Sequence, residues 1–298
     1  MKPEISVIVP VYNDAAGLET TLGSLVDQDV PEGSYEIIVA DNGSGDGSLA
    51  VAEGFVAANS GLIKAVVEDQ IQSSYAARNK GVLEARGDIL CFIDADMWVE
   101  KDYLERIRNA LSKTDIFYLG CNVRIVTSAN NVIQRYHQFS GFPVERYIQQ
   151  YQFAPTCGVV VRRSVFDKVG HFDPRLISSG DREFGNRVAE AGYTLSYDEH
   201  IIMYHPAYKT FRKFPSKCFR LGRGMFQLTE FYPSRYDFKY GHRPDLFNKR
   251  EVSCETKRPP CLNIQDRVFF CLLTLMCKII KDAGFLYERF RSCRSKKS

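Results

Sequence analysis

Strand-like and helix-like patterns alternate over the first hundred residues, and this alternation is the strongest constraint on the fold. The run Ile5–Val9 is rich in β-branched residues and predicts a buried strand. Leu18, Leu22 and Leu25 follow at helical spacing and predict an amphipathic helix. The alternation continues with predicted strands at 36–40, 63–67 and 89–93 and predicted helices at 48–58 and 74–85. Strands and helices at this spacing indicate an α/β fold with βαβ units in a doubly wound, mostly parallel sheet.

Polar residues follow the carboxyl ends of these predicted strands. The first strand runs into PVYN (10–13), the second into DNGSGDG (41–47), the third into Glu68 and Asp69, and the fourth into Asp94 and Asp96. In open α/β sheets ligands bind beyond the carboxyl ends of the strands. We therefore expect the functional site at this acidic edge of the sheet.

Asp94 and Asp96 are separated by one residue and come directly after an apolar run. An unpaired carboxylate is costly to bury, whereas two carboxylates at this spacing can face one hard cation such as Mg²⁺ or Mn²⁺. Two solvated loop aspartates would show the same spacing. The acidic surroundings favour the metal site.

Three further residues at this edge are candidates for contact with a nucleotide. Asp41 could accept hydrogen bonds from a base or a ribose, although Asp-Asn-Gly-Ser is also a turn sequence. Tyr12 could stack on a nucleobase, and packing is the alternative. Arg78, in the predicted helix 74–85, either reaches a base or phosphate or occupies a helix surface.

Taken in order, these motifs resemble a known family. PVYN (10–13), DNGSGDGS (41–48), ARNKG (77–81), GDILCFIDAD (87–96) and GDREFGNRVAEAGY (180–193) occur within residues 4–205. With them the sequence resembles glycosyltransferase family 2, which has the GT-A fold with a Rossmann-like sheet. The resemblance implies a nucleotide-sugar donor, Mn²⁺ or Mg²⁺ at the D-x-D motif, and inversion at the anomeric carbon.

The resemblance also implies roles for the residues that hold the donor. Pro10, Tyr12 and Asp41 would bind the nucleoside, with Arg78 near the base. Asp94 would lie near the ribose or the metal. Asp96 would ligate the metal that bridges the two phosphates.

On the acceptor side, the resemblance implies that Asp181 is the general base. Gly180 stands where the family often has Glu, which weakens this assignment without removing it. Negative charge at Asp181 and Glu183 would also suit a helix N-terminus, whatever its function. His205 follows a predicted strand and is either a core or solvent-facing histidine or a third metal ligand, as related enzymes suggest.

Charge is distributed unevenly along the chain. Residues 1–208 carry 18 Lys and Arg against 28 Asp and Glu, a net −10, and residues 209–298 carry 21 against 8, a net +13. We expect a GT-A nucleotide-sugar-binding and catalytic domain at 1–208 and a basic, partly amphipathic helical C-terminal extension at 209–298.

The apolar run 268–280 lies in this predicted extension. It is interrupted by Lys278 and is shorter than the roughly 20 residues of a spanning helix. An amphipathic helix with basic surroundings lies in a membrane interface. We therefore expect peripheral contact with the anionic inner face of a membrane, and packing of the run onto the catalytic domain is the alternative.

The resemblance to glycosyltransferase family 2 implies a non-processive inverting glycosyltransferase. Processive members of the family carry a QxxRW motif and transmembrane helices, and the single Trp of this chain is Trp98. A UDP-sugar donor is favoured because a carboxylate at the base edge, as expected for Asp41, suits the N3–H of uracil. The acceptor would be a glycan, a lipid-linked molecule or a small molecule.

Two other functions share this α/β core. One is a catalytically inactive protein that binds nucleotide sugars or glycans. The other is a sugar nucleotidyltransferase, which would need a basic, Gly-rich phosphate loop that PVYNDAAGLE lacks. No nucleic-acid recognition module is evident, so no nucleic-acid partner is expected. The nine cysteines form no CxxC pair, which favours reduced thiols and a cytoplasmic location.

Overall fold

The computed structural model describes residues 2–112, 115–129, 131–236 and 264–295. The chain forms two compact units. Unit 1 comprises residues 1–128, 141–175 and 180–206, and unit 2 comprises 129–140, 176–179 and 207–298. Each unit is made of three separate segments of the chain. The division at residue 208 into a catalytic domain and an extension stays a prediction.

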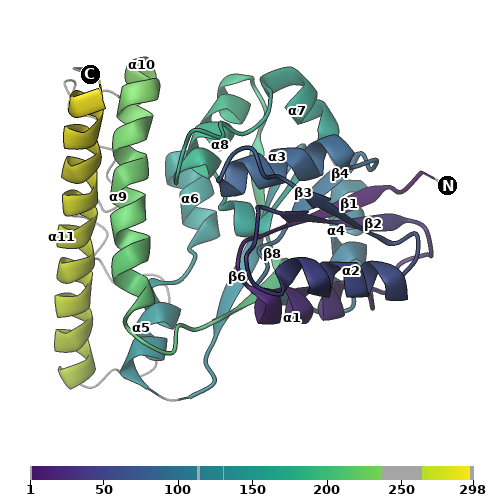
Figure 1. The fold of residues 1–298 in the computed structure, drawn as a ribbon, viewed down its shortest axis with the longest axis horizontal. Helices are drawn as coiled ribbons and strands as arrows, with labels where there is room; N and C mark the ends of the chain where they lie inside the picture. The colour runs from purple at the N-terminus through teal and green to yellow at the C-terminus, as the bar shows by residue number, and fades with distance from the viewer. Residues whose placement is uncertain (1, 113–114, 130, 237–263, 296–298) are drawn as a thin grey trace. The chain divides into compact units, whose positions relative to one another are not determined.

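Unit 1 is built on an eight-stranded sheet with the strand order β3-β2-β1-β4-β7-β6-β8-β5 (Figure 1). The strands are β1 (Ile5–Val11), β2 (Tyr35–Asp41), β3 (Ile63–Val67), β4 (Ile89–Phe92), β5 (Trp98–Val99), β6 (Tyr118–Val126), β7 (Val159–Arg162) and β8 (Leu195–Pro206). β7 and β5 run antiparallel to their neighbours, and the other pairs are parallel. The predicted mostly parallel, doubly wound sheet is confirmed.

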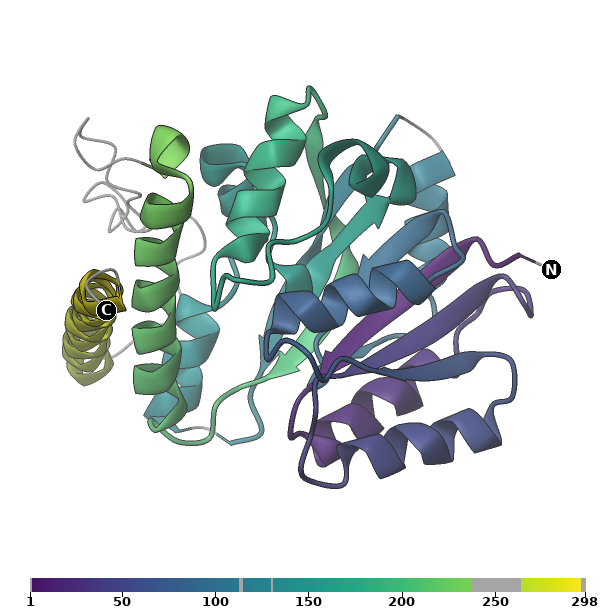
Figure 2. The ribbon, with the colours of Figure 1, turned by 45° about the horizontal axis from the view of Figure 1, so that its top comes forward.

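Helices cover both faces of this sheet. They are α1 (Ala15–Leu25), α2 (Ser48–Ala58), α3 (Ser74–Glu84), α4 (Tyr103–Ser112), α6 (Val144–Tyr151), α7 (Arg163–Val169) and α8 (Gly180–Glu190). α1 and α2 lie on one face and α3 lies on the other (Figures 1 and 2), as right-handed crossovers require when the strand order reverses. That reversal places the carboxyl ends of β1 and β4 side by side, which is where ligands bind in such sheets.

Close packing of α3 on β1 positions the residues at this edge. Ile8 of β1 is fully buried. A Cβ atom on Gly81 of α3 would lie 2.5 Å from Cγ2 of Ile8, so the helix approaches the strand more closely than a larger residue would allow. Arg78, one turn earlier in α3, is thereby held against the sheet and is buried.

The apolar pattern of the sequence alone predicts two short strands, at 193–197 and 201–204, where the structure has the single strand β8. The structure has one strand with an irregular register against β6, in which Cys121 pairs with Asp198 while its neighbour Asn122 pairs with Ile202. Extra residues on one strand form a bulge that leaves the pairing on both sides intact. The polar segment Asp-Glu-His at 198–200 therefore interrupts the apolar pattern without ending the strand.

Unit 2 is helical. Its helices are α5 (Val132–Ser140), α9 (Lys213–Phe231), α10 (Pro233–Tyr236) and α11 (Ile264–Ser295), so α11 is much longer than the apolar run at 268–280. α9 and α11 lie side by side (Figure 1). Glycines permit this contact, because a Cβ atom on Gly222 would meet the carbonyl of Lys281, and one on Gly284 would meet that of Phe219. The predicted helical character of the C-terminal region is confirmed.

An aromatic cluster forms the core of unit 2. Tyr136, Phe214, Phe270 and Leu273 are buried together in it. Among the helices that the structure describes, none combines the length and the apolar composition needed to cross a membrane.

Candidate functional site

Asp41, the last residue of β2, is buried with 2% of its surface exposed. Its Oδ2 accepts hydrogen bonds from the backbone N–H groups of Gly43 (3.0 Å) and Ser44 (2.9 Å). Its Oδ1 is buried and has no hydrogen-bond partner among the described residues. A buried acceptor without a donor is costly. A ligand that supplies an N–H or O–H group to Oδ1 would remove that cost.

The loops after β1 and β2 are joined by hydrogen bonds. The backbone N–H of Asn13 donates to Oγ of Ser44 (3.0 Å), and the N–H of Gly45 donates to Oδ1 of Asn13 (2.7 Å). Asn13 has φ 53°, a left-handed conformation that Asn tolerates better than most residues. Tyr12 is held beside this junction with 53% of its surface exposed, so its ring is available to a ligand.

Pro10 occupies a different environment from Tyr12. It lies within β1, is buried, and pairs in register with Ala40 of β2. It therefore contributes to the backbone shape at this edge of the sheet.

Arg78 and Asp94 form an ion pair in which Nη2 of Arg78 lies 2.5 Å from Oδ1 of Asp94. Nη1 of Arg78 donates to the carbonyl of Ser74 (3.1 Å), and the guanidinium lies 5.8 Å from the ring centroid of Tyr75. Arg78 is only 4% exposed, so it does not occupy the helix surface that was the alternative expectation. Its cation therefore compensates a carboxylate at the end of β4.

Asp96 and His205 approach each other at the same edge. Oδ2 of Asp96 lies 3.6 Å from Nε2 of His205, and His205 is buried. Nδ1 of His205 lies 2.7 Å from the carbonyl oxygen of Pro206. A carbonyl oxygen can only accept, so Nδ1 carries a proton, and Nε2 faces the carboxylate.

These two residues fit a divalent cation chemically. A metal-binding histidine typically donates its second ring N–H to a backbone carbonyl, as His205 does to Pro206. The described residues contain no group of three or more His, Cys, Asp or Glu side chains arranged to hold a metal. Mg²⁺ and Mn²⁺ sites that include substrate phosphates need fewer protein ligands. Asp96 and His205 thus suit a site shared with a diphosphate.

Asp181 lies in the first turn of α8, and its carboxyl group is buried although the residue as a whole is partly exposed. Burial raises the pKa of its carboxyl above the ordinary value. The N–H of Arg182, which donates to Oδ1 at 2.9 Å, and the guanidinium of Arg78 oppose that rise in pKa, and the carboxylate of Asp94 adds to it. Asp181 and Asp94 are far apart in sequence, yet their charges interact around Arg78.

Tyr75 is a residue of this site that the sequence did not reveal. Its hydroxyl accepts a hydrogen bond from the N–H of Gly180 (2.8 Å), and burial followed by the Asp181 carboxylate raises its pKa well above the ordinary value. A Cβ atom at position 180 would lie 2.7 Å from Cζ of Tyr75. The Tyr75 ring thus leaves no room for a side chain at position 180. The sequence signal that could have identified Tyr75 as a site residue is its position one turn before Arg78 on the same helix.

Two further phenols interact with the Asp181 carboxylate. Burial raises the pKa of Tyr147 to about 12, Arg146 lowers it, and Asp181 raises it. Burial also raises the pKa of Tyr118, with a smaller contribution from Asp181. The carboxyl of Asp181 thus interacts with several buried phenols, and its burial makes ionisation less favourable than in water.

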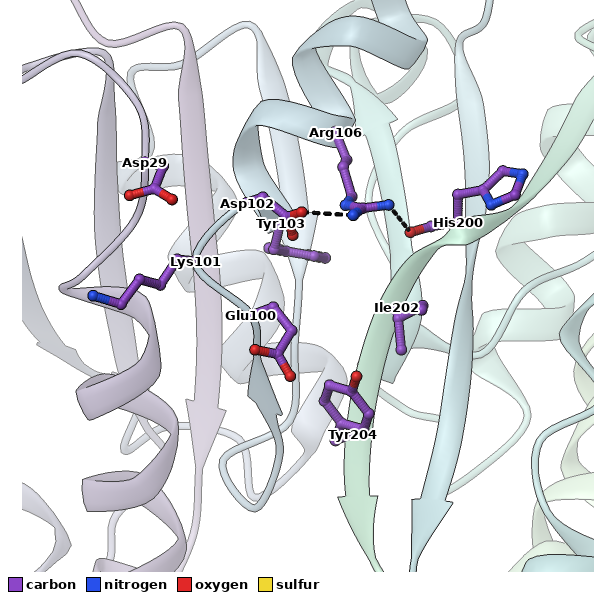
Figure 3. Close-up of a pocket in the computed structure, with 9 residues that line it drawn as sticks. All are labelled: Asp29, Glu100, Lys101, Asp102, Tyr103, Arg106, His200, Ile202 and Tyr204. Carbon is purple, nitrogen blue, oxygen red and sulfur yellow. Dashed lines mark hydrogen bonds and ion pairs between the residues drawn. The ribbon is translucent and has the colours of Figure 1, made fainter.

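A surface pocket of about 530 Å³ lies elsewhere in unit 1. Figure 3 shows Arg106 in this pocket between the carboxylate of Asp102 and the backbone carbonyl of His200. Tyr204 lines the pocket, whereas its neighbour His205 faces Asp96. Successive strand residues point to opposite faces of a sheet. This pocket is therefore separate from the candidate site.

Comparisons with known proteins identify the family of this chain. The model of Glycosyl transferase family 2 matches residues 6–170. Glycosyltransferase AglE of Haloferax volcanii is 36% identical over 227 residues, which cover 76% of this chain and 74% of that protein.

Solved structures show the same fold at low identity. Mannosyltransferase PcManGT from Pyrobaculum calidifontis, in complex with GDP-Man and Mn²⁺, has a TM-score of 0.63 at 18% identity, covering 95% of this chain and 74% of that one. S. aureus TarS 1–349 in complex with UDP-GlcNAc has a TM-score of 0.56 at 18% identity, covering 83% and 77%. The chain belongs to glycosyl transferase family 2 and is a glycosyltransferase with the GT-A fold.

Proposed function

We propose that this glycosyltransferase is non-processive and inverting, and that Asp181 is its general base. The observation that carries the proposal is the pair of carboxylates around Arg78. Asp94 is held by Arg78 in an ion pair, while burial raises the pKa of Asp181. Carboxylates in unequal environments can take different roles. A carboxylate with a raised pKa is the better proton acceptor.

In this mechanism a single displacement moves the sugar. Asp181 takes the proton of an acceptor hydroxyl as that oxygen attacks the anomeric carbon from the face opposite the leaving nucleoside diphosphate. The backbone N–H of Arg182 holds Oδ1 of Asp181, which leaves Oδ2 for the proton. One catalytic carboxylate is enough, and the paired acid and base of a glycosidase are not required.

The donor in this proposal is a nucleoside-diphosphate sugar bound at the ends of β1 and β2. The buried Oδ1 of Asp41 has no protein donor among the described residues, and the N3–H of uracil would supply one. The exposed ring of Tyr12 would stack on the base, and Pro10 would shape the backbone beneath it. The two structural neighbours are complexes with GDP-Man and UDP-GlcNAc. Asp41 leads us to favour a UDP-sugar.

Asp96 and His205 are the residues that would hold Mn²⁺ or Mg²⁺, with Asp94 adjacent to the ion. The complex of the neighbour PcManGT contains Mn²⁺. When bound, the ion would offset the charge that develops on the departing diphosphate. Nδ1 of His205, fixed on the carbonyl of Pro206, keeps Nε2 directed at this position.

The location and partners complete the proposal. The enzyme would act in the cytoplasm, peripherally on the anionic inner face of a membrane, on a glycan, lipid-linked or small-molecule acceptor. Nucleic acid is not among the proposed partners. Residues 1–208 would form the catalytic domain and 209–298 the basic extension, as the charge distribution suggests.

The stereochemistry of the product tests the proposed displacement. The donors are UDP-sugars of known anomeric configuration, and proton NMR of the isolated product reports the configuration of the new bond. We expect the opposite configuration from that of the donor. Retention would contradict a single displacement and, with it, the role of Asp181 as the only catalytic carboxylate.

A further inference from the structure

One face of α11 in unit 2 carries an exposed apolar stripe. We define the α11 stripe as Val268, Leu272, Leu275, Ile279, Leu286 and Phe290. Their exposed fractions range from 48% at Leu286 to 67% at Phe290. Most of them are three or four residues apart, which places them on one side of a helix. Six large apolar side chains in a row are more than the scattered exposed residues of an ordinary surface.

The opposite face of α11 already has partners within unit 2. Phe270 and Leu273 belong to the buried aromatic cluster, and the ring of Phe285 lies 5.3 Å from that of Phe226 on α9. Glu288 is buried and lies 2.6 Å from Arg223 of α9. Packing among the described residues of unit 2 therefore uses the other face of α11 rather than the α11 stripe.

A row of cations borders the α11 stripe. Arg267, Lys278 and Arg289 follow one another at intervals of eleven residues and are exposed. Eleven residues are close to three turns of a helix, so the three side chains form a line along one edge of the stripe. The acid Asp266 lies 2.8 Å from Arg135, and Glu288 is buried. Among the described residues of α11, Asp282 is the one acid classed as exposed.

We propose that the α11 stripe docks on an anionic lipid surface, with α11 lying in the plane of the interface. This inference rests on the proposed peripheral location of the transferase, and it identifies the α11 stripe as the surface that would contact the membrane. The apolar side chains would enter the boundary between headgroups and acyl chains, while Arg267, Lys278 and Arg289 bind lipid phosphates. A helix of this length extends about 48 Å along the surface at 1.5 Å per residue.

Charge distinguishes this partner from a second copy of the chain. Two α11 helices paired through their stripes would bring edges rich in Arg and Lys together, with Asp282 as the one exposed acid on each described helix. Like charges at such an edge oppose pairing. An anionic bilayer offers the charge complementary to Arg267, Lys278 and Arg289, which outnumber Asp282 on this edge.

Co-sedimentation of the full chain with vesicles tests the proposal. Vesicles of phosphatidylcholine alone are compared with vesicles that also contain phosphatidylglycerol, at low and high salt. We expect binding to the anionic vesicles and a loss of binding as salt increases, because salt screens the cations. Absence of binding to the anionic vesicles at low salt would overturn the proposal.

Matched variants assign the binding to α11. Leu272→Glu should lower the partition coefficient at least tenfold, whereas Leu83→Glu, which changes an equally exposed leucine of α3, should leave it unchanged. The triple variant Arg267→Gln, Lys278→Gln and Arg289→Gln should lower it by on the order of 100-fold, since each cation near an anionic surface adds about 1 kcal/mol. Its control is Lys2→Gln, Lys64→Gln and Lys101→Gln, which removes three exposed charges from unit 1.

Other outcomes of these experiments would contradict the docking of the α11 stripe on a lipid surface. Equal losses in the variants and their controls would assign binding to net charge and contradict a role for the stripe. A dimer in light scattering that Leu272→Glu dissociates would identify a second copy as the occupant. UDP binding measured by calorimetry on the same samples reports the proposed transferase site separately. Intact UDP binding without vesicle binding would refute only this inference.

Discussion

At the scale of single residues, the ionised carboxylate of Asp181 is needed for the proposed catalysis but is unfavourable for the stability of the fold. Burial raises the pKa of its carboxyl, so the folded protein holds the proton to a higher pH than the unfolded chain. Ionisation therefore costs folding free energy as the pH rises from about 3.9, the ordinary aspartate value, through the raised pKa. The same ionised form is the one that can accept a proton from the acceptor.

We expect Asp181→Asn to be more stable than the wild type at pH 8 by roughly 1 kcal/mol. The difference should shrink towards pH 4, where the carboxyl of the wild type is protonated in the fold. Urea denaturation at both pH values measures it. Asp69→Asn, a change at an exposed aspartate of unit 1, is the control and should show little pH dependence. A stability difference for Asp181→Asn that is the same at both pH values would refute the raised pKa.

Asp96 carries a second prediction at this scale. Asn has the shape of Asp without its charge, so Asp96→Asn should bind Mn²⁺ weakly and transfer sugar at least about 100-fold more slowly. Electron paramagnetic resonance of Mn²⁺ with UDP present measures the binding. Asp27→Asn, an equally conservative change at an exposed aspartate, should behave as the wild type. A wild-type rate for Asp96→Asn at saturating Mn²⁺ would remove Asp96 from the proposed metal site.

The sequence could predict residues that belong to short local motifs. Asp41 ends β2, Asp94 and Asp96 come just after β4, and the sheet topology brings the ends of those strands to one edge. It could not predict the contact of Tyr75 with Gly180, because those residues are 105 positions apart and meet only when α8 packs near α3. Gly180 departs from the residue that the family often has at this position, and only the folded structure shows that the Tyr75 ring lies against it.

At the scale of elements, the entry of the chain into α8 depends on this same contact. A Cβ atom at position 180 would lie within 3.0 Å of three ring carbons of Tyr75, and an aromatic ring cannot yield as a flexible side chain can. We expect Gly180→Ala to destabilise the fold by about 1 to 3 kcal/mol through overpacking.

Chemical denaturation of two alanine variants checks this prediction. Gly23→Ala in α1 is the matched control, because a Cβ atom there meets no atom within 4 Å. It should be neutral or stabilising by up to about 1 kcal/mol, since Ala favours a helix interior over Gly. Equal effects of the two substitutions would show that the Tyr75 ring does not restrict position 180.

The predictability of the elements follows from how local their signals are. The strands and helices up to β4 alternate in a regular pattern, and α2 and β3 have the predicted bounds. β8 was divided wrongly because its polar bulge resembles a turn, and only the pairing with β6 shows that the strand continues. The length of α11 was underestimated because its exposed charged residues interrupt the apolar run that marked it.

At the scale of the whole molecule, sequence and fold together identify the enzyme class. Family membership supports transfer over a nucleotidyltransferase, whose basic phosphate loop the sequence lacks. The uneven charge of the chain was visible in the sequence. Its organisation into two units, which interleave along the chain, was not, because residues 129–140 and 176–179 join unit 2 through contacts distant in sequence.

The most direct test of the proposed site compares the wild type with Asp181→Asn. It measures the release of nucleoside diphosphate from a panel of UDP- and GDP-sugars, with and without Mn²⁺. We expect Mn²⁺-dependent release from a UDP-sugar by the wild type. Asp181→Asn should be slower by about 100-fold or more, the usual contribution of a general base, with donor affinity by calorimetry unchanged. Wild-type turnover in Asp181→Asn, or loss of donor affinity together with the rate, would contradict the assignment of Asp181 as the base.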